Sequence, residues 1–308
     1  MVEEKCPCKP ICWNPKAKDR MKSIGIIANP KKPQVKETVQ TIIDWAEKNN
    51  AEFFLGEEMV PLLQHKERAF PREKLADKAE VIVSLGGDGT MLATARAVGN
   101  RGNPILGINL KSFGFLTEIR AEDLKKTLDR VLKKDFRIEQ RMVLKSRIMD
   151  ETEPYLYALN DVVIDKGGVA RLILMHLYDN EEFICSYSAD GLIVSTPTGS
   201  TAYSLASGGP IINPRLNVII VSPICPHTLA SRPIIFLEND KLNVRVESTG
   251  ERDAVLTADG QVARPVKSGK SVIVEKAEYS VNLIRFPESS FYEILRKKLH
   301  WGARPKRE

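Results

Sequence analysis

The hydrophobic pattern of this 308-residue chain changes near residue 138, and this change limits its fold more than any other feature. Before that point, short apolar runs such as 23–29 and 80–85 alternate with amphipathic stretches such as 36–50, whose apolar residues recur with helical spacing. Continuous apolar strands separated by amphipathic helices predict a parallel sheet that helices cover on both faces. We therefore expect an α/β N-terminal domain with a Rossmann-like sheet.

After residue 138 the chain consists almost entirely of strand-length segments that are rich in β-branched residues and separated by turn residues. This pattern predicts a C-terminal β-sandwich domain. Helical spacing returns only at 288–301, and we expect this C-terminal helix to pack back on the N-terminal domain. The expected parts are an extension at 1–22, which we expect to be disordered, an α/β domain at 23–137 with 286–308, and an all-β domain at 138–285.

Charge and composition exclude several classes of protein. Residues 1–22 carry a net charge of +3 and residues 296–308 one of +5, within a total of +6, so the chain between them has no basic excess. This distribution predicts solvated tails and no nucleic-acid-binding surface. No apolar run approaches the roughly 20 residues of a membrane span, and the basic start lacks the apolar segment of a signal peptide. We expect a cytoplasmic protein that binds neither nucleic acid nor membranes.

Three of the five cysteines, Cys6, Cys8 and Cys12, lie in the N-terminal extension. Their spacing could belong to a metal or redox site, but it lacks a fourth ligand and includes two prolines, which favours a plain extension or a misassigned start. We therefore expect no metal site built by the chain. The odd number of cysteines argues against a disulfide framework, and we expect Cys185 and Cys225 to be small core residues.

The segment "VIVSLGGDGTMLATAR" places three glycines around one acid, where a predicted strand meets a predicted helix. Gly86, Gly87 and Gly89 can adopt backbone angles closed to other residues, and their missing side chains would let a phosphate approach the main-chain amides. The helix, expected to begin at Thr90, would direct the positive end of its dipole to the same place. The segment predicts a phosphate-binding turn, although it is neither a G-x-G-x-x-G fingerprint nor a P-loop.

Asp88 is the unexpected member of this turn, because a carboxylate repels phosphate. An acid here would be useful if it accepted a proton from an attacking hydroxyl, or held Mg²⁺, beside a phosphoryl group in transit. The alternative is a turn or N-cap residue, for which Asp is a favoured type. The turn alone does not decide between the two.

A second polar segment, residues 188–210, contains eight Ser or Thr residues and four glycines. Hydroxyls and free amides at this density suit a polyhydroxylated, amide-bearing ligand such as a nucleotide, and Tyr203 offers a ring for stacking. The alternative is a long polar loop without a ligand.

Two shorter segments are also ambiguous. Asn160 and Asp161 interrupt an apolar strand, and adjacent strand residues point to opposite faces, so both cannot lie in the core. Their side chains could read adenine or ribose edges, or they could simply form a strand-end turn. Asp259 and Gly260 are similar to a hairpin turn, which is the simpler interpretation of that segment.

Together these motifs resemble the NAD kinase family. Four family motifs recur: GGDGT at 86–90, N-x-x-x-x-G-F-L within 109–118, an Asn-Glu pair changed to Asn-Asp at 160–161, and D-G-L-I-V-S-T-P-T-G-S-T-A-Y-S at 190–204. Segments 222–234, 259–261 and 295–302 also fit, so the resemblance covers about residues 23–302. GGDGT is shared with lipid kinases and phosphofructokinase-like enzymes, whereas the last of the four motifs is highly specific.

The resemblance implies transfer of a phosphoryl group from ATP, or from polyphosphate in some members, to the 2′-hydroxyl of the adenosine ribose of NAD, giving NADP. It implies that the α/β domain binds nucleotide, that the β-domain binds NAD, and that the site lies between them. Mg²⁺ would arrive with the triphosphate, as is usual for a hard cation. Relatives are commonly homodimers or homotetramers, so the resemblance also implies a homo-oligomer.

By the same resemblance, Asp88 would be the catalytic base for the 2′-hydroxyl. A ribose hydroxyl is far less acidic than a carboxylic acid, so its proton would leave late, in a loose transition state. The other matched residues would bind substrate and nucleotide. They are Gly86, Gly87, Gly89, Thr90, Asn109, Phe113, Asn160, Asp161, Asp190, Thr198, Thr201, Ala202, Tyr203, Ser204 and Gln261.

Two departures from the family pattern have consequences. Asp161 replaces the commoner glutamate and is one methylene shorter, so its hydrogen bond would need a shifted backbone or a water molecule. Ser188 stands where some relatives carry a bulky basic residue. The smaller side chain of serine would leave the pocket more permissive toward NADH. Two other functions compete with this interpretation: a lipid kinase, which should have an apolar acceptor cleft, and a non-catalytic NAD(P)-binding regulator, against which the intact Asp88 argues.

Overall fold

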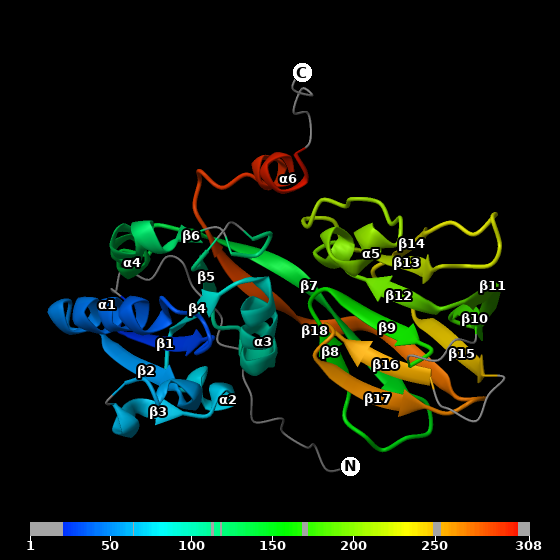
Figure 1. The fold of residues 1–308 in the computed structure, drawn as a ribbon, viewed down its shortest axis with the longest axis horizontal. Coiled ribbons are helices and arrows are strands. Elements are labelled where there is room, and N and C mark those ends of the chain that lie inside the picture. The colour runs from blue at the N-terminus through cyan, green and yellow to red at the C-terminus, as the bar shows by residue number, and fades with distance from the viewer. Residues whose placement is uncertain are drawn as a thin grey trace, which may run out of the picture. The chain divides into compact units, whose positions relative to one another are not determined.

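The computed structural model describes residues 21–63, 65–111, 114–117, 119–167, 172–248 and 254–300. The chain divides into two compact units, one formed by residues up to Gln140 and from Val281 onward, the other by residues 141–280 (Figure 1). Two long strands, β7 (Arg137–Ile148) and β18 (Ser271–Arg285), each contain one of the two points of division.

The first unit is built on a parallel sheet with the strand order β18-β5-β4-β1-β2-β3, in which β6 also pairs with β5. Its strands are β1 (Ser23–Ala28), β2 (Glu52–Gly56), β3 (Ala69–Phe70), β4 (Val81–Gly86), β5 (Ile105–Asn109) and β6 (Ile119–Arg120). The pairs among β1 to β6 are parallel, and Leu283 of β18 pairs in parallel with Ile105. The predicted parallel sheet is therefore confirmed.

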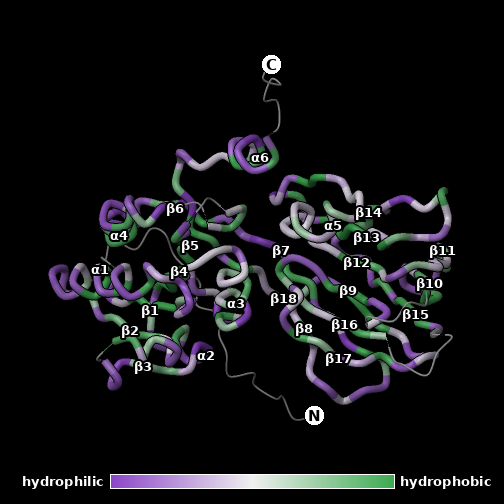
Figure 2. Tube along the Cα trace, in the orientation of Figure 1, coloured by the Kyte–Doolittle hydropathy of each residue, from purple (hydrophilic) through white to green (hydrophobic). Residues whose placement is uncertain are grey.

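Helices cover both faces of this sheet. They are α1 (Val35–Lys48), α2 (Arg72–Leu75), α3 (Asp88–Val98) and α4 (Leu124–Leu132). Helix α6 (Phe291–Leu299) follows β18 near the C-terminus. Apolar residues of α1 and α4 share one core with alternate residues of β1 and β4, while α3 reaches the other face, where Thr94 donates a hydrogen bond to Ser84 at 2.9 Å. Covered on both sides, β1 and β4 are buried along their whole lengths, and hydrophobic residues run along them in Figure 2.

The second unit consists of two antiparallel sheets that share one core, as predicted. In one sheet, β11 (Glu182–Ala189), β10 (Ile173–Asp179), β15 (Leu242–Ser248) and β18 are neighbours, and β7 pairs with β8 (Leu156–Ala158). The other sheet has the order β14 (Ile234–Leu237), β13 (Val218–Ile224), β12 (Gly191–Ser195), β9 (Asp161–Asp165), β16 (Ala254–Ala258) and β17 (Val262–Val266). Inward-facing residues such as Met175 and Val244 of the first sheet pack with Val162 and Leu192 of the second.

The sequence pattern of residues 183–196 predicts a single strand. In the structure these residues form two strands, which belong to different sheets. The chain leaves β11 at Ala189, passes through Asp190 and enters β12 at Gly191. Beyond β12, the polar segment forms the 3₁₀ turn η5 (Gly199–Thr201) and the short helix α5 (Tyr203–Ala206). The structure thus places Asp190 at a crossover between sheets, a position that periodicity does not reveal.

The cysteines differ from expectation in one respect. Cys185 is half-buried, but Cys225 is exposed and has a φ of 43°, so the prediction that Cys225 is a core residue was wrong. Cys6, Cys8 and Cys12 lie outside the described residues. Within the described ranges, no helix has the length and the apolar character that crossing a membrane requires.

Candidate active site

The glycine-rich turn lies between β4 and α3, but its backbone differs from expectation. Gly87 is the N-cap residue and is extended, with φ −125° and ψ −168°, and α3 begins at Asp88, two residues before the predicted start. None of the three glycines of this turn has a positive φ, so the structure does not use the freedom of glycine to adopt left-handed angles here. Because Gly87 holds the N-cap position, Asp88 is not an N-cap residue, which was one of the two roles in the alternative interpretation.

Space explains the glycines better than backbone freedom. A Cβ atom at Gly86 would lie 2.2 Å from Thr90 Oγ1, so the turn closes tightly on its own helix at this residue. A Cβ atom at Gly87 or Gly89 would meet nothing within 4 Å. The main chain on either side of Asp88 is therefore open to a ligand, at the end of a helix whose dipole favours anions.

The Asp88 carboxylate is held by the loop that follows β5. Asp88 Oδ2 accepts a hydrogen bond from the main-chain N–H of Phe115 at 2.9 Å, and Oδ1 accepts one from Leu116 at 3.1 Å and one from the Thr117 hydroxyl at 3.2 Å. Asn109, which was predicted to bind substrate, donates from Nδ2 to Thr117 Oγ1 at 2.8 Å. The structure therefore connects Asp88 and Asn109 through Thr117. Thr117 was not among the predicted site residues.

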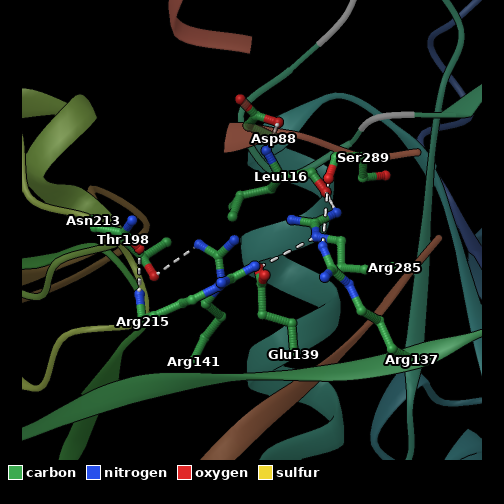
Figure 3. Close-up of polar contacts among 10 residues, drawn as sticks. All are labelled: Asp88, Leu116, Arg137, Glu139, Arg141, Thr198, Asn213, Arg215, Arg285 and Ser289. Carbon is green, nitrogen blue, oxygen red and sulfur yellow. Dashed lines mark hydrogen bonds and ion pairs between the residues drawn. The ribbon is translucent and has the colours of Figure 1, made fainter. Parts of the chain in front are cut away.

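A buried arginine holds the other side of this loop (Figure 3). Arg285, near the end of β18, is 3% exposed and donates to the carbonyl of Leu116 at 3.1 Å. Its Nε lies 3.5 Å from a carboxylate oxygen of Glu139, which offsets part of the cost of burying the guanidinium. Leu116 is thus bound through its N–H to Asp88 and through its carbonyl to Arg285.

The polar segment of the second unit uses most of its hydroxyls internally. Thr198 accepts a hydrogen bond from Arg141 at 3.2 Å, Ser200 donates to the carbonyl of Pro197, and Ser204 bonds to Ser222 at 3.1 Å. Thr198 and Ser204, two predicted ligand residues, have buried side chains. Their hydroxyls shape the segment instead of facing solvent.

Other predicted residues of this segment remain accessible. The ring of Tyr203 is 46% exposed, and Thr201 and Ala202 are half-buried. Burial raises the pKa of Tyr203, and the nearby carboxylates Asp165, Asp161 and Asp190 raise it further, together with Cys225. Asp190 itself is paired with Lys166 at 2.6 Å.

Asp259 organises the chain around Asn160. Its carboxylate accepts main-chain N–H bonds from Leu159 at 3.0 Å, from Asn160 at 2.7 Å and from Asp161 at 3.3 Å. Asp259 and Gly260 both have positive φ, as the predicted hairpin turn requires, and the exposed Gln261 follows them. One turn therefore fixes both Asn160 and the position of Gln261.

The carboxylate of Asp161 lies at the start of β9 and is 5% exposed. Among the described residues, no hydrogen bond or ion pair reaches it. Burial, with a further contribution from the charge of Asp259, raises the pKa of Asp161 to about 7. A buried acid without donors in the chain can accept hydrogen bonds from a ligand that carries hydroxyl groups.

The remaining predictions concern Phe113 and metals. Phe113 lies outside the described residues. The residues that the structure does describe contain no group of three or more His, Cys, Asp or Glu side chains placed to hold a metal ion.

Comparisons with known proteins point to one family. Residues 24–136 match a model described as the ATP-NAD kinase N-terminal domain, and residues 159–286 match the ATP-NAD kinase C-terminal domain. The NAD kinase of Heliobacterium modesticaldum is 41% identical over 92% of this chain and 100% of its own length. That of Solibacter usitatus is 40% identical over 92% of this chain and 99% of its own length.

Two solved structures have a similar fold. A yeast NADH kinase complexed with NADH has a TM-score of 0.85 and 23% identity, and the alignment covers 94% of this chain and 91% of the yeast chain. An NAD kinase from Archaeoglobus fulgidus in complex with ATP has a TM-score of 0.72 and 24% identity, over 90% of this chain and 97% of the other. These similarities confirm the fold class.

The geometry of the glycine turn predicts opposite effects for two similar substitutions. Gly86→Ala should lower the free energy of unfolding by about 1–3 kcal/mol, because the new methyl group overlaps Thr90. Gly89→Ala adds a methyl group in open space within a helix, and should leave stability unchanged or raise it by up to about 1 kcal/mol. Urea unfolding of both variants checks this, and an equal loss in both would contradict it.

The raised pKa of Asp161, about 7 against 3.8 for an ordinary aspartate, predicts a pH dependence of stability. Between these two values the folded protein binds more protons than the unfolded chain, so stability falls as the pH rises toward 7 and levels off above it. Asp161→Asn removes this titration, so the variant should gain about 2 kcal/mol relative to the parent between pH 5 and pH 8. Urea unfolding at both pH values measures the gain, and parallel pH profiles would show that Asp161 is ionised throughout.

Proposed function

The chain belongs to the NAD kinase family and is an enzyme that phosphorylates NAD with ATP to form NADP; from this premise we propose which residues carry the reaction. One observation supports the assignment more than any other. The Asp88 carboxylate stands at the first turn of α3, flanked by two residues whose side-chain directions are open. An acid at this position of a phosphate-binding turn is suited to an acceptor hydroxyl beside a phosphoryl group.

In the proposed reaction, the 2′-hydroxyl oxygen of the adenosine ribose attacks the terminal phosphorus of ATP. A new P–O bond forms, the bond to the bridging oxygen of ADP breaks, and the proton of the hydroxyl passes to Asp88. The open main chain at Gly87 and Gly89 lets phosphate oxygens approach the amides at the N-terminus of α3. Positioning and electrostatic stabilisation supply most of the acceleration in reactions of this class.

ATP is the phosphoryl donor, and we propose that Mg²⁺ arrives as part of the substrate MgATP. Mg²⁺ commonly binds through one or two carboxylates together with the phosphates of a substrate, as this proposal requires. Polyphosphate as an alternative donor remains a prediction.

The second unit would bind the dinucleotide. Asn160 and Asp161 are proposed to meet the adenosine, with Asp161 accepting from ribose hydroxyls and Tyr203 stacking its exposed ring. Asp190, Thr201, Ala202 and Gln261 remain proposed pocket residues, whereas the buried hydroxyls of Thr198 and Ser204 would act by shaping the segment. A homodimer or homotetramer, a cytoplasmic location and the absence of nucleic-acid and membrane partners also remain predictions.

The first functional prediction concerns Asp88. Asp88→Asn should lower kcat by roughly 10²–10⁴-fold, because the amide cannot accept the proton, while NAD binding is largely kept. The assay uses purified protein, MgATP and NAD, with NADP detected by a dehydrogenase that uses only NADP, and calorimetry measures NAD binding.

Asp44→Asn is a matched control, because Asp44 is an exposed residue of α1. It should leave turnover unchanged. Full turnover in Asp88→Asn would remove Asp88 from the mechanism, and absence of NADP with the parent enzyme would overturn the proposed function.

Acceptance of NADH is a second candidate activity, and Ser188 is the observation that favours it. This small residue lies on β11, two positions before Asp190, and its side chain is half-buried. A bulky basic side chain here would add a positive charge near Asp190, whereas serine leaves that space free.

We therefore expect kcat/KM for NAD to exceed that for NADH by less than about 100-fold, because pockets without a repelling group discriminate weakly. Ser188→Arg should increase the preference for NAD. Steady-state kinetics with both dinucleotides measures this ratio. A preference of the parent enzyme for NAD of about 100-fold or more would exclude the NADH activity.

A further inference from the structure

The two oxygens of the Asp88 carboxylate have different surroundings. Oδ1 accepts two hydrogen bonds, from the N–H of Leu116 and from the hydroxyl of Thr117. Among the described residues, Oδ2 accepts one, from the N–H of Phe115. Since each carboxylate oxygen has about two lone-pair sites, Oδ1 is filled by the chain itself and Oδ2 retains one site.

The direction of every hydrogen bond that leads to Oδ1 is determined by the chemistry of its groups. The main-chain N–H of Lys111 donates to Asn109 Oδ1 at 3.0 Å, which turns the amide nitrogen of Asn109 toward Thr117. That nitrogen can only donate, so Thr117 Oγ1 accepts its hydrogen bond and must use its own proton elsewhere. A carboxylate can only accept, so the Thr117 hydroxyl donates to Asp88.

This network is closely packed, and its central residue is buried. Thr117 is fully buried, with 0% exposure. A Cβ atom at Gly114 would lie 2.1 Å from Asp88 Oδ1 and 2.4 Å from Thr117 Oγ1, so only glycine leaves room for the contact between them. From the other side, Arg285 fixes the carbonyl of Leu116. The carboxylate is thus restrained from several directions before any ligand arrives.

We propose that Thr117 is a positioning residue for the phosphoryl transfer: with Leu116 it saturates Oδ1 of Asp88, and it thereby makes Oδ2 the oxygen that takes the proton of the acceptor hydroxyl. This inference rests on the proposed function, in which Asp88 is the base. In the step itself, the O–H bond of the acceptor breaks as its oxygen bonds to phosphorus, and the proton moves to the remaining lone-pair site of Oδ2. Asn109 acts one step further away, by fixing the direction of the Thr117 hydroxyl.

The decisive variant is Thr117→Val, which keeps the shape of the side chain and removes the hydroxyl. It should lower kcat by about 10- to 100-fold, because a misplaced catalytic group costs this much, and should leave KM for NAD and for ATP within about twofold. Thr117→Ser retains the hydroxyl and should restore kcat to within about threefold of the parent. Thr38→Val is the matched control, since Thr38 is also a buried threonine of the first unit, and its hydroxyl donates to the carbonyl of Gln34, the N-cap residue of its own helix.

Gly114→Ala provides an independent test, because the added methyl group displaces the carboxylate of Asp88 instead of removing a donor. It should reproduce the loss of kcat seen in Thr117→Val. In an Asp88→Asn background, Thr117→Val should have little further effect, because both changes act on the same proton transfer.

These outcomes separate the inference from the function on which it rests. If the parent enzyme makes no NADP, or if Asp88→Asn retains full turnover, the proposed function fails. If Asp88→Asn is impaired but Thr117→Val keeps the parent kcat, or is not rescued by serine, the positioning role is overturned. The positioning role is also overturned if Thr117→Val lowers the remaining kcat of Asp88→Asn by the same factor as it lowers kcat of the parent enzyme.

Discussion

The glycine-rich turn depends on the hydrogen bonds between one carboxylate and the main chain of a loop that is distant in sequence. Asp88 leads α3 out of β4, while Phe115 and Leu116 follow β5, the parallel neighbour of β4. The carboxyl ends of adjacent parallel strands lie at the same edge of a sheet, so an acid after one strand can reach the loop after the next. The parallel sheet therefore places Asp88 beside this loop.

The end of the chain completes this arrangement. β18 pairs with β5 at Leu283 and Ile105, and two residues later Arg285 reaches the carbonyl of Leu116. The start of α3 and the end of β18 thus both contact the loop that follows β5. A buried guanidinium is expensive unless it is paired, and Arg285 meets both a carbonyl and the carboxylate of Glu139. The loop that holds Asp88 is consequently supported by the last strand of the first unit.

Periodicity was sufficient to predict the parallel sheet, the β-sandwich and the strand-to-helix turn, because each of these follows from local patterns of apolar residues and glycines. The sequence offered two reasons for the glycines, backbone angle and missing side chains, and could not decide between them, since it shows where side chains are missing but not whether space or backbone angle requires it. Thr117 and Arg285 were missed for a related reason. Their importance comes from partners 29 and 169 residues away, and only the folded sheet brings these together.

Asp161 shows why a binding residue can be costly to the free protein. Asp259 is needed nearby to accept three main-chain N–H bonds, and its charge adds to the burial that already disfavours ionisation of Asp161. The fold therefore maintains two acids close together with donors for only one of them among the described residues. Hydroxyl donors from a bound ribose would stabilise the ionised form of the second, so dinucleotide binding and ionisation of Asp161 would favour each other. An aspartate here, shorter than the family's glutamate, would tie this coupling to a deeply buried carboxylate, and substrate binding would then offset the cost in stability.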